Sequence, residues 1–309
     1  MRLERTGARE YALMFPQTSH VFNSVAFTEL NRGKCDDIHY LFGLDDHGKV
    51  RLGITLGERD DSLRSPFSAP FGGVEQTKAQ NVEFYIGFAG ALKDYGVTHG
   101  KEVRLTLPPM FYDRGGNIAK LHCALLTQGA RAVTEYNYHY PLDRFGGYIE
   151  SLSTEARKKF RKGERFGFNL EILTGSASDV ARAYGVIKAN RDSHGYPLRM
   201  SLEDVMATAR VIKATFMVMS RDGEDVAAVQ AFDVAPGIVQ IIYWGDAPGY
   251  SALRPMRFLP YKVFEYFSSA GKMIVDVGPS STDGIPSVGL CDFKEDVGCI
   301  LTPKTSFVL

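Results

Sequence analysis

The sequence contains few cysteines and a single tryptophan among its 309 residues. Its cysteines, at positions 35, 123, 291 and 299, form no C-x-x-C pair and show no metal-ligand spacing. Four thiols in a chain of this length are too sparse for a disulfide scaffold, which is typical of a reducing compartment. We therefore expect a cytoplasmic protein with reduced thiols and no metal site.

Excess charge of one sign is also absent, because 36 basic residues balance 36 acidic ones. A general nucleic-acid binder would carry a basic excess, so DNA binding is not expected and any RNA contact must come from a local patch. No apolar run approaches the length that spans a membrane, and the N-terminus, with Arg2, Glu4 and Arg5, lacks the apolar core of a signal peptide. The sequence predicts no membrane insertion.

Several well-known catalytic motifs are missing. The chain has no G-x-S-x-G elbow, no H-E-x-x-H pair, no Walker loop and no G-x-G-x-x-G after a strand. Hydrolase, metalloprotease, NTPase and dinucleotide oxidoreductase activities therefore lose their best sequence support, and no permanently bound cofactor is expected. The length and the 44% hydrophobic content are enough for two ordinary globular domains.

The stretch from 238 to 298 holds the clearest pattern. Residues 238–244 form an apolar run rich in β-branched and aromatic residues, which predicts a buried strand. Leu259, Val263 and Phe267 then share one face of a helix, and residues 273–277 form a second apolar run. Strand, helix and strand in this order predict a right-handed crossover between parallel strands, with a ligand crevice at their carboxyl ends.

The same order of elements is predicted twice. In the first half, strands are predicted at 38–44, 49–56, 102–107 and 131–140. A helix opened by a capping box at 77–80 and another helix from about 117 are also predicted there. In the second half, helices are predicted around 180–187 and 201–209, joined by the segment 190–196, together with a hairpin of 215–220 with 225–233. Lys101 and Lys272 lie 171 residues apart before matching strands. Gly129 and Gly298 lie 169 apart. We interpret 1–145 and 146–309 as two tandem α/β units, each a mixed sheet with a β-meander and a parallel βαβ crossover.

This order resembles the GNAT acyltransferase fold, and two such units in tandem resemble the Fem-type (FemABX) transferases, which attach amino acids to peptidoglycan precursors in the cytoplasm. The segments that carry the resemblance are 152–162, 276–278, Gly289-Leu290 and Phe293-Lys294. The resemblance implies acyl or aminoacyl transfer onto an amine of a small or cell-envelope-precursor substrate, with the second unit catalytic. It places Phe293 at the active site and gives Lys294 the stabilisation of charge during transfer.

One departure concerns the donor. GNAT enzymes that use acyl-CoA carry a glycine-rich loop after the central strand, where backbone N–H groups hold the pyrophosphate. Here the corresponding segment, 246–255, has a single glycine at the wrong spacing. This weakens acyl-CoA as cosubstrate relative to aminoacyl-tRNA, whereas the lack of net basic charge points the other way. Both donors remain candidates.

Further candidate site residues surround the predicted crossover. Tyr243 can protonate a leaving group, and Trp244 and Tyr250 can line a substrate pocket. Gly278 and Ser280, after the second strand, are predicted to contact the substrate. Lys158, Arg161 and Lys162 belong to a dense basic cluster that can neutralise phosphates of a nucleotide-linked acceptor or of tRNA.

Each of these residues has a structural alternative. Lys294 can be a solvated helix lysine among Asp292, Glu295 and Asp296, the basic cluster can be a solvated helix face, and Phe293 and Trp244 can be packing residues. The whole chain can also be a noncatalytic ligand-binding module on a degenerate GNAT fold, because fold does not fix function.

Overall fold

The computed structural model describes residues 1–113 and 115–309. The chain divides into two compact units: unit 1 is Met1–Tyr136, Ser281–Pro286 and Thr302–Leu309, and unit 2 is Asn137–Ser280 and Ser287–Leu301. The division of the chain into independent domains at 145/146 stays a prediction.

Unit 1 is built around one mixed sheet, with the strand order β1-β2-β3-β4-β6-β15 and with β5 paired to β3. Its strands are β1 (Arg2–Thr6), β2 (Asp37–Leu44), β3 (Val50–Arg59), β4 (Ser62–Ser65), β5 (Val74–Gln76) and β6 (Glu102–Thr106), joined by the end of β15 (Ile300–Val308) and accompanied by the hairpin β13 (Ser281–Thr282) and β14 (Ile285–Pro286). β2, β3 and β4 form an antiparallel meander, and β4 pairs in parallel with β6. The predicted meander and crossover are confirmed here.

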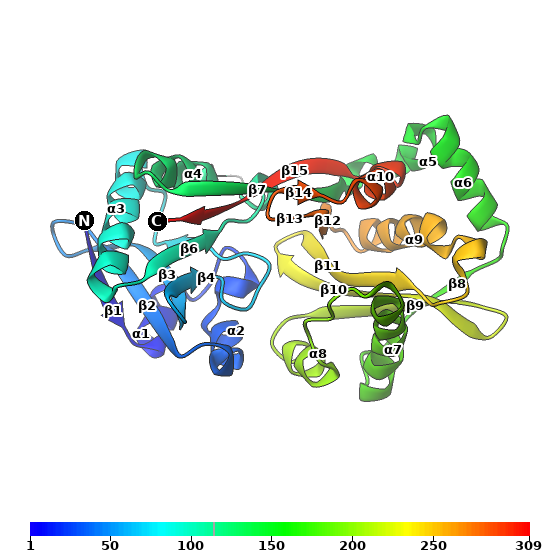
Figure 1. The fold of residues 1–309 in the computed structure, drawn as a ribbon, viewed down its shortest axis with the longest axis horizontal. Helices are drawn as coiled ribbons and strands as arrows, with labels where there is room; N and C mark the ends of the chain where they lie inside the picture. Colours follow the sequence, from blue (N-terminus) through cyan, green and yellow to red (C-terminus); the bar gives the residue numbers. More distant parts are fainter. Residues whose placement is uncertain (114) are drawn as a thin grey trace. The chain divides into compact units, whose positions relative to one another are not determined.

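Helices cover both faces of the unit 1 sheet. They are α1 (Ala8–Met14), α2 (Val25–Leu30), α3 (Val82–His99) and α4 (Asn117–Thr127), with short 3-10 turns at Val21–Asn23, Arg32–Lys34 and Met110–Tyr112. Leu41 of β2 packs in one apolar cluster with α3 and α4, whereas its neighbours Tyr40 and Phe42 pack in another with α1. This alternation follows from the two-residue period of a strand, and Figure 1 shows α3 and α4 on the opposite side of the sheet from α1.

Unit 2 repeats the arrangement. Its sheet has the order β7-β12-β11-β10-β9-β8, made by the end of β7 (Arg131–Pro141) with β8 (Asn169–Ile172), β9 (Ala214–Arg221), β10 (Glu224–Ala235), β11 (Ile238–Asp246) and β12 (Ile274–Pro279). Its helices are α5 (Tyr148–Ser151), α6 (Thr154–Glu164), α7 (Ala177–His194), α8 (Leu202–Thr208), α9 (Pro255–Ser269) and α10 (Val288–Asp296), with 3-10 turns at Leu142–Gly147 and Ser251–Leu253. β11 and β12 are parallel, which confirms the second crossover.

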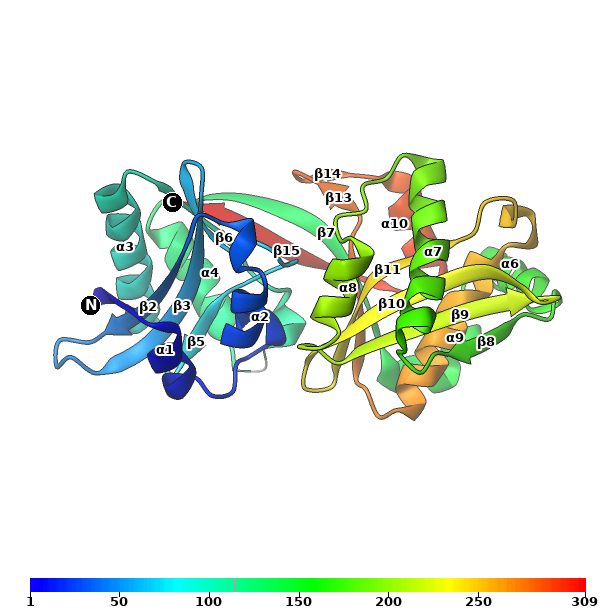
Figure 2. The ribbon, with the colours of Figure 1, turned by 90° about the horizontal axis from the view of Figure 1, so that it is seen from below.

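The two faces of the unit 2 sheet carry different helices. Met217 and Met219 of β9 pack with α6 and α9, whereas Phe216 and Val218 pack with α7 and α8. Figures 1 and 2 show α7 and α8 on one face and α9 on the other. The sheet is therefore buried on both sides, as expected of strands in a crossover fold.

The last strand of each unit comes from the other half of the chain. β7 follows α4 in sequence, but its end pairs with β12 of unit 2. β15 follows α10, but its end pairs antiparallel with β6 of unit 1, with Ser306 opposite Thr106. Each sheet is completed by an exchanged strand.

Local details of the prediction were wrong at three places. The predicted capping box at 77–80 does not open α3, whose N-cap is Asn81 without a side-chain hydrogen bond. The segment 190–194 is the last helical part of α7, which ends at Gly195 in the left-handed conformation, and is not a loop. β1 and α1 had no clear sequence pattern and were not predicted. In the described part of the chain, no helix is both long and apolar enough to cross a membrane.

Candidate functional site

In unit 2, strands β11 and β12 separate beyond a short parallel pairing. Only three residue pairs join them, from Ile238 with Ile274 to Gln240 with Asp276. Beyond this point β11 stays with β10 as far as Asp246, whereas β12 continues its pairing with β7 after a register shift. The divergence opens the carboxyl ends of two parallel strands, which is where α/β sheets bind ligands.

Backbone irregularities accompany the divergence. The β10–β11 register shifts between Gln230 and Ala231, and the β12–β7 register shifts between Asp276 and Gly278. Gly278 has a φ of 76°, a left-handed conformation that suits glycine. Such bulges bend a strand and redirect its side chains, so these irregularities carry β12 away from β11.

A buried polar cluster lies at the point of divergence. The fully buried Asp276 carboxylate accepts hydrogen bonds from Asn137 Nδ2 and Gln240 Nε2, each at 2.9 Å, and from the Gly278 N–H at 3.0 Å. The side-chain oxygens of Asn137 and Gln240 and the hydroxyl of Ser280 are buried without a hydrogen-bond partner among the described residues. Unsatisfied buried groups of this kind call for a bound water or ligand.

Lys294 lies inside the protein next to this cluster. Its side chain is 2% exposed, and its Nζ donates to the carbonyl oxygens of Gly278 at 2.8 Å and Pro279 at 3.0 Å. The ammonium also lies 5.5 Å from the centre of the Tyr138 ring, within the range of a cation–π contact. The interpretation of Lys294 as a solvated lysine is therefore wrong. α10 turns Cys291 and Lys294, three residues apart, toward the interior.

The predicted aromatic residues divide between the two faces of β11. Trp244 and Phe293 pack together on the α9 face, with ring centroids 6.0 Å apart and nearly perpendicular planes. Tyr243 belongs to the α7 and α8 face, where its hydroxyl accepts the Arg199 N–H at 3.2 Å. Tyr250 donates to the Glu224 carboxylate. Lys294, Gly278 and Ser280 thus come together, whereas Tyr243 belongs to a different environment.

The Tyr243 environment contains a cationic residue that the sequence did not single out. The guanidinium of Arg191, at the end of α7, lies 5.2 Å from the Tyr243 ring centre and 5.8 Å from that of Tyr196. Its Nε is buried without a hydrogen-bond partner, and no carboxylate in the described residues forms an ion pair with it. Burial lowers the pKa of Arg191. An arginine that contacts two aromatic rings and lacks a counter-ion is suited to bind an anionic group of a ligand.

The predicted basic cluster lies on α6, where Lys158, Arg161 and Lys162 are exposed. Arg161 is paired with Glu164 at 2.8 Å. Lys158 and Lys162 lie one helical turn apart and make no ion pair within the part of the chain that the structure describes, so both charges are available to a partner.

The loop between β11 and α9 uses its own backbone donors. The N–H groups of Tyr250, Leu253 and Arg254 are bonded to carbonyl oxygens of Ala247, Tyr250 and Ser251. Pro255 begins α9 and has no N–H to offer. These three N–H groups are used within the loop and Pro255 has none, so the loop differs from the glycine-rich loop that holds a pyrophosphate at a helix N-terminus. Among the described residues, His, Cys, Asp and Glu side chains form no group of three that could hold a metal ion.

Comparison with known proteins supports the fold. No family model and no curated protein sequence matches the chain. The crystal structure of FemX is similar over 100% of this chain and 97% of its own, with a TM-score of 0.69 and 11% identity. The C-terminal domain (DUF2156) of a putative lysylphosphatidylglycerol synthetase from Agrobacterium fabrum has a TM-score of 0.60 and 14% identity over 98% of this chain and 92% of its own.

A tandem GNAT protein from the clavulanic acid biosynthesis pathway has a TM-score of 0.50 and 12% identity over 100% of this chain and 98% of its own. Identities this low establish the shared architecture and leave activity to be argued from the site. The predicted tandem GNAT-like fold is confirmed.

Proposed function

We propose that the protein is an N-acyltransferase that moves an acyl or aminoacyl group onto the amine of an acceptor carrying an anionic group. The observation that carries this proposal is the buried Lys294 ammonium, held by the Gly278 and Pro279 carbonyl oxygens where β12 leaves β11. The architecture shared with FemX and with a tandem GNAT protein supports the same class of reaction.

The proposed reaction joins the acceptor nitrogen to the acyl carbon. The neutral amine attacks the carbonyl carbon of an ester or thioester, and the carbonyl oxygen gains negative charge. A positive charge fixed in a dry site stabilises that oxyanion more strongly than water does, which is the role we assign to Lys294. The C–O or C–S bond then breaks, and the proton released by the nitrogen passes to the leaving group. Phe293 and Trp244 line the apolar side of this site.

The donor that these features favour is an aminoacyl-tRNA. Three N–H groups of the β11–α9 loop are used internally and Pro255 has none, which makes the loop a poorer support for the pyrophosphate of an acyl-CoA than a glycine-rich loop. Exposed Lys158 and Lys162 on α6 are suited to RNA phosphates. On the α7 and α8 face, Arg191 would hold a phosphate or carboxylate of a ligand beside the rings of Tyr243 and Tyr196.

The test measures transfer of radiolabel from a mixed pool of aminoacyl-tRNA to nucleotide-linked amines. We expect transfer by the wild-type protein and a loss of roughly a hundredfold in Lys294→Met, because removing one stabilising donor from an oxyanion site costs about that much. Lys213→Met is the control, since Lys213 is exposed. A melting curve of each variant checks that it is folded.

The alternatives give different results. Equal turnover by Lys294→Met and the wild type would remove Lys294 from the mechanism. A saturable rise in the protein's melting temperature with acetyl-CoA or longer acyl-CoAs, and none with tRNA, would identify acyl-CoA as the donor in place of aminoacyl-tRNA. Binding of ligands without any transfer would indicate the noncatalytic module.

A further inference from the structure

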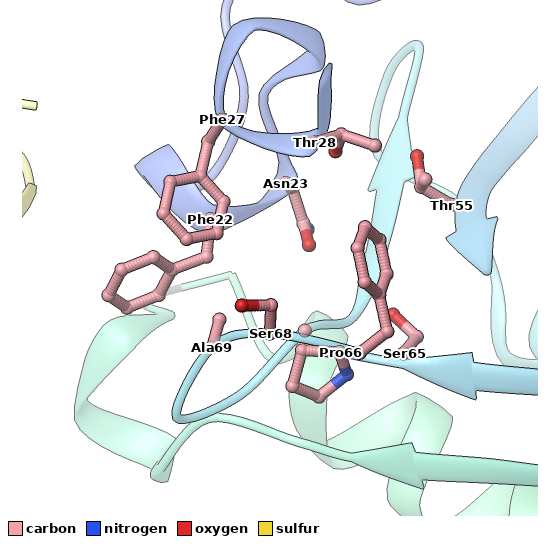
Figure 3. A pocket seen from close by; sticks show the side chains of 11 residues that line it. Phe22, Asn23, Phe27, Thr28, Thr55, Ser65, Pro66, Ser68 and Ala69 are labelled. Carbon is pink, nitrogen blue, oxygen red and sulfur yellow. The ribbon is translucent and has the colours of Figure 1, made fainter. Parts of the chain in front are cut away.

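The pocket of unit 1 is too small for a substrate. It lies between the α2 region and the segment 65–72, and Figure 3 shows Phe22, Phe27 and Ser68 on its walls. Its cavity volume is about 20 Å³, which is enough for one water molecule. This pocket therefore adds no substrate site to the one around Lys294.

The position of the Lys294 ammonium depends on the backbone of two residues. Its Nζ donates to the carbonyl oxygens of Gly278 and Pro279, at 2.8 and 3.0 Å. Both residues follow the register shift in β12, and Gly278 has a φ of 76°. Because the ammonium is held by this backbone, whatever fixes residues 278 and 279 also fixes the charge.

The Asp276 carboxylate fixes the same backbone from the other side. Its Oδ1 accepts the N–H of Gly278 at 3.0 Å, a bond from the backbone to a side chain two residues earlier that is typical of turns. The N–H of Gly278 is thus bonded to Asp276, and its carbonyl oxygen is bonded to Lys294. Gly278 therefore connects the carboxylate to the ammonium.

The carboxylate is itself held by two further strands. Asn137 Nδ2, on β7, donates to Oδ1 of Asp276, and Gln240 Nε2, on β11, donates to Oδ2, each at 2.9 Å. Asp276 is fully buried, so bulk water does not compete for these bonds. Donors from three strands fix both carboxylate oxygens, and surroundings of this kind hold an irregular backbone in one conformation.

The two charges also act on a common neighbour. Burial raises the pKa of the Cys299 thiol to about 12, the Lys294 ammonium opposes this rise and the Asp276 carboxylate adds to it. Charges that shift the pKa of one buried thiol share its surroundings. Asp276 and Lys294 therefore belong to one buried electrostatic environment as well as to one chain of hydrogen bonds.

We propose that Asp276 is a positioning residue for the transfer reaction and acts on Lys294 through Gly278. It does not touch the substrate. Its carboxylate keeps the two carbonyl oxygens where they hold the ammonium beside the developing oxyanion, and a displacement of about 1 Å at such a site can cost about a hundredfold in rate. This inference rests on the proposed function, because it gives Asp276 a part in the same reaction.

A double-variant cycle tests the proposal with the mixed aminoacyl-tRNA pool and the nucleotide-linked amines. Asp276→Asn keeps the size of the side chain but removes its charge and one of its two acceptor oxygens. We expect kcat to fall roughly tenfold to a hundredfold, with KM for the aminoacyl-tRNA unchanged. In the Lys294→Met background the same change should cost less than about twofold further, because the residue through which Asp276 acts is gone.

A second measurement follows the Lys294 amine directly and needs no turnover. Acetylation by acetic anhydride, measured at Lys294 by mass spectrometry, should be slow in the wild type and roughly tenfold faster in Asp276→Asn, because the ammonium is held less firmly. Lys304 is the internal reference, since it is also buried and lies in unit 1. Val180→Ala is the matched control. It removes buried apolar volume from α7 and should lower the melting temperature, but leave kcat and Lys294 acetylation unchanged.

The outcomes separate the positioning role from the proposed reaction. An equal loss of kcat from Asp276→Asn in the wild-type and Lys294→Met backgrounds, or unchanged acetylation of Lys294 in the folded variant, would overturn the positioning role. No transfer by the wild-type protein would overturn the reaction and the positioning role with it, whereas faster acetylation would still show that Asp276 holds Lys294. If Asp276→Asn does not fold, Gln240→Met removes one donor to the carboxylate and should show the same effects more weakly.

Discussion

Arg191 illustrates how a single residue can favour binding over stability. Its guanidinium is partly removed from water near the rings of Tyr243 and Tyr196 and has no carboxylate partner in the described residues. A desolvated cation without a counter-ion costs free energy in the unliganded protein. The cost is recovered when an anion binds.

Arg191→Met should therefore weaken ligand binding without weakening the fold. We expect affinity for UDP and inorganic pyrophosphate to fall roughly tenfold to a hundredfold, since hydrogen bonds to charged groups contribute about 1.5–3 kcal/mol. The melting temperature without ligand should stay equal or rise. Isothermal titration and melting curves measure the two effects, with exposed Arg210→Met as control. A folded variant that binds both anions as the wild type does would contradict the assignment.

His20 should make stability depend on pH. Burial lowers the pKa of His20 to about 4 from 6.5, so the folded protein keeps this imidazole neutral where the unfolded chain takes up a proton. The unfolding free energy should therefore fall as the pH drops from about 6.5 to 4. Below about pH 4, His20 should cause no further loss of stability.

The expected slope from His20 is about 1.4 kcal/mol per pH unit within this window. Other histidines, such as His39 and His139, also have lowered pKa values, so the effect must be isolated by comparison with His20→Phe. Denaturant titrations between about pH 4 and 7 should show a shallower pH dependence in the variant. Parallel curves for the two proteins would show that His20 does not titrate in this way.

At the scale of elements, hydrophobic periodicity predicted the long and regular strands and helices. The strands 38–44 and 238–244 and the helices over 180–187 and 259–267 are confirmed, because each buries a continuous apolar face. β1 and α1 were missed because their residues alternate poorly; four of the five residues of β1 are charged or polar. Helix N-caps were predicted less well, because a cap depends on which backbone N–H a side chain reaches in the folded structure.

The candidate site was predicted less completely than the fold. Lys294 was identified through the resemblance, and its burial follows from the direction of α10, which sequence spacing alone did not decide. Arg191 was not singled out, because its significance comes from rings 5 and 52 positions further along the chain. The Asp276 cluster joins Asn137 and Gln240 across three strands and has no local signal.

Helix α6 should act as one surface toward RNA. Lys158 and Lys162 lie on the same side of the helix, and each phosphate contact contributes about 0.7 to the dependence of log affinity on log salt for single strands. The double variant Lys158→Ala/Lys162→Ala should bind tRNA more weakly, with a slope lower by about 1 to 2. Filter binding between about 50 and 200 mM salt measures this slope. An unchanged slope would show that Lys158 and Lys162 do not contact RNA phosphates.

At the scale of the whole molecule, the exchanged strands predict that the end of β15 stabilises unit 1. Phe307 of β15 is 1% exposed and belongs to the cluster formed with α3 and α4. Phe307→Ala should lower the unfolding free energy by about 3–5 kcal/mol. Removal of 302–309 should cost more, because β6 also loses its hydrogen-bonded neighbour.

Denaturant unfolding followed by circular dichroism measures these losses. Leu301→Ala, at an exposed position of the same strand, is the matched control and should change stability by less than about 0.5 kcal/mol. Wild-type stability in the truncated protein would show that the β15–β6 pairing contributes little.

The exchanged strand also affects how the chain folds during its synthesis. Residues 1–136 leave the ribosome long before 302–309. β6 therefore lacks its neighbouring strand, the end of β15, while unit 2 is translated. An open strand edge is a template for pairing with other chains, and domains otherwise tend to fold as they emerge. The first unit therefore finishes folding only after residues 302–309 have emerged, and the nascent protein is most prone to aggregate, and most dependent on chaperones, in that interval.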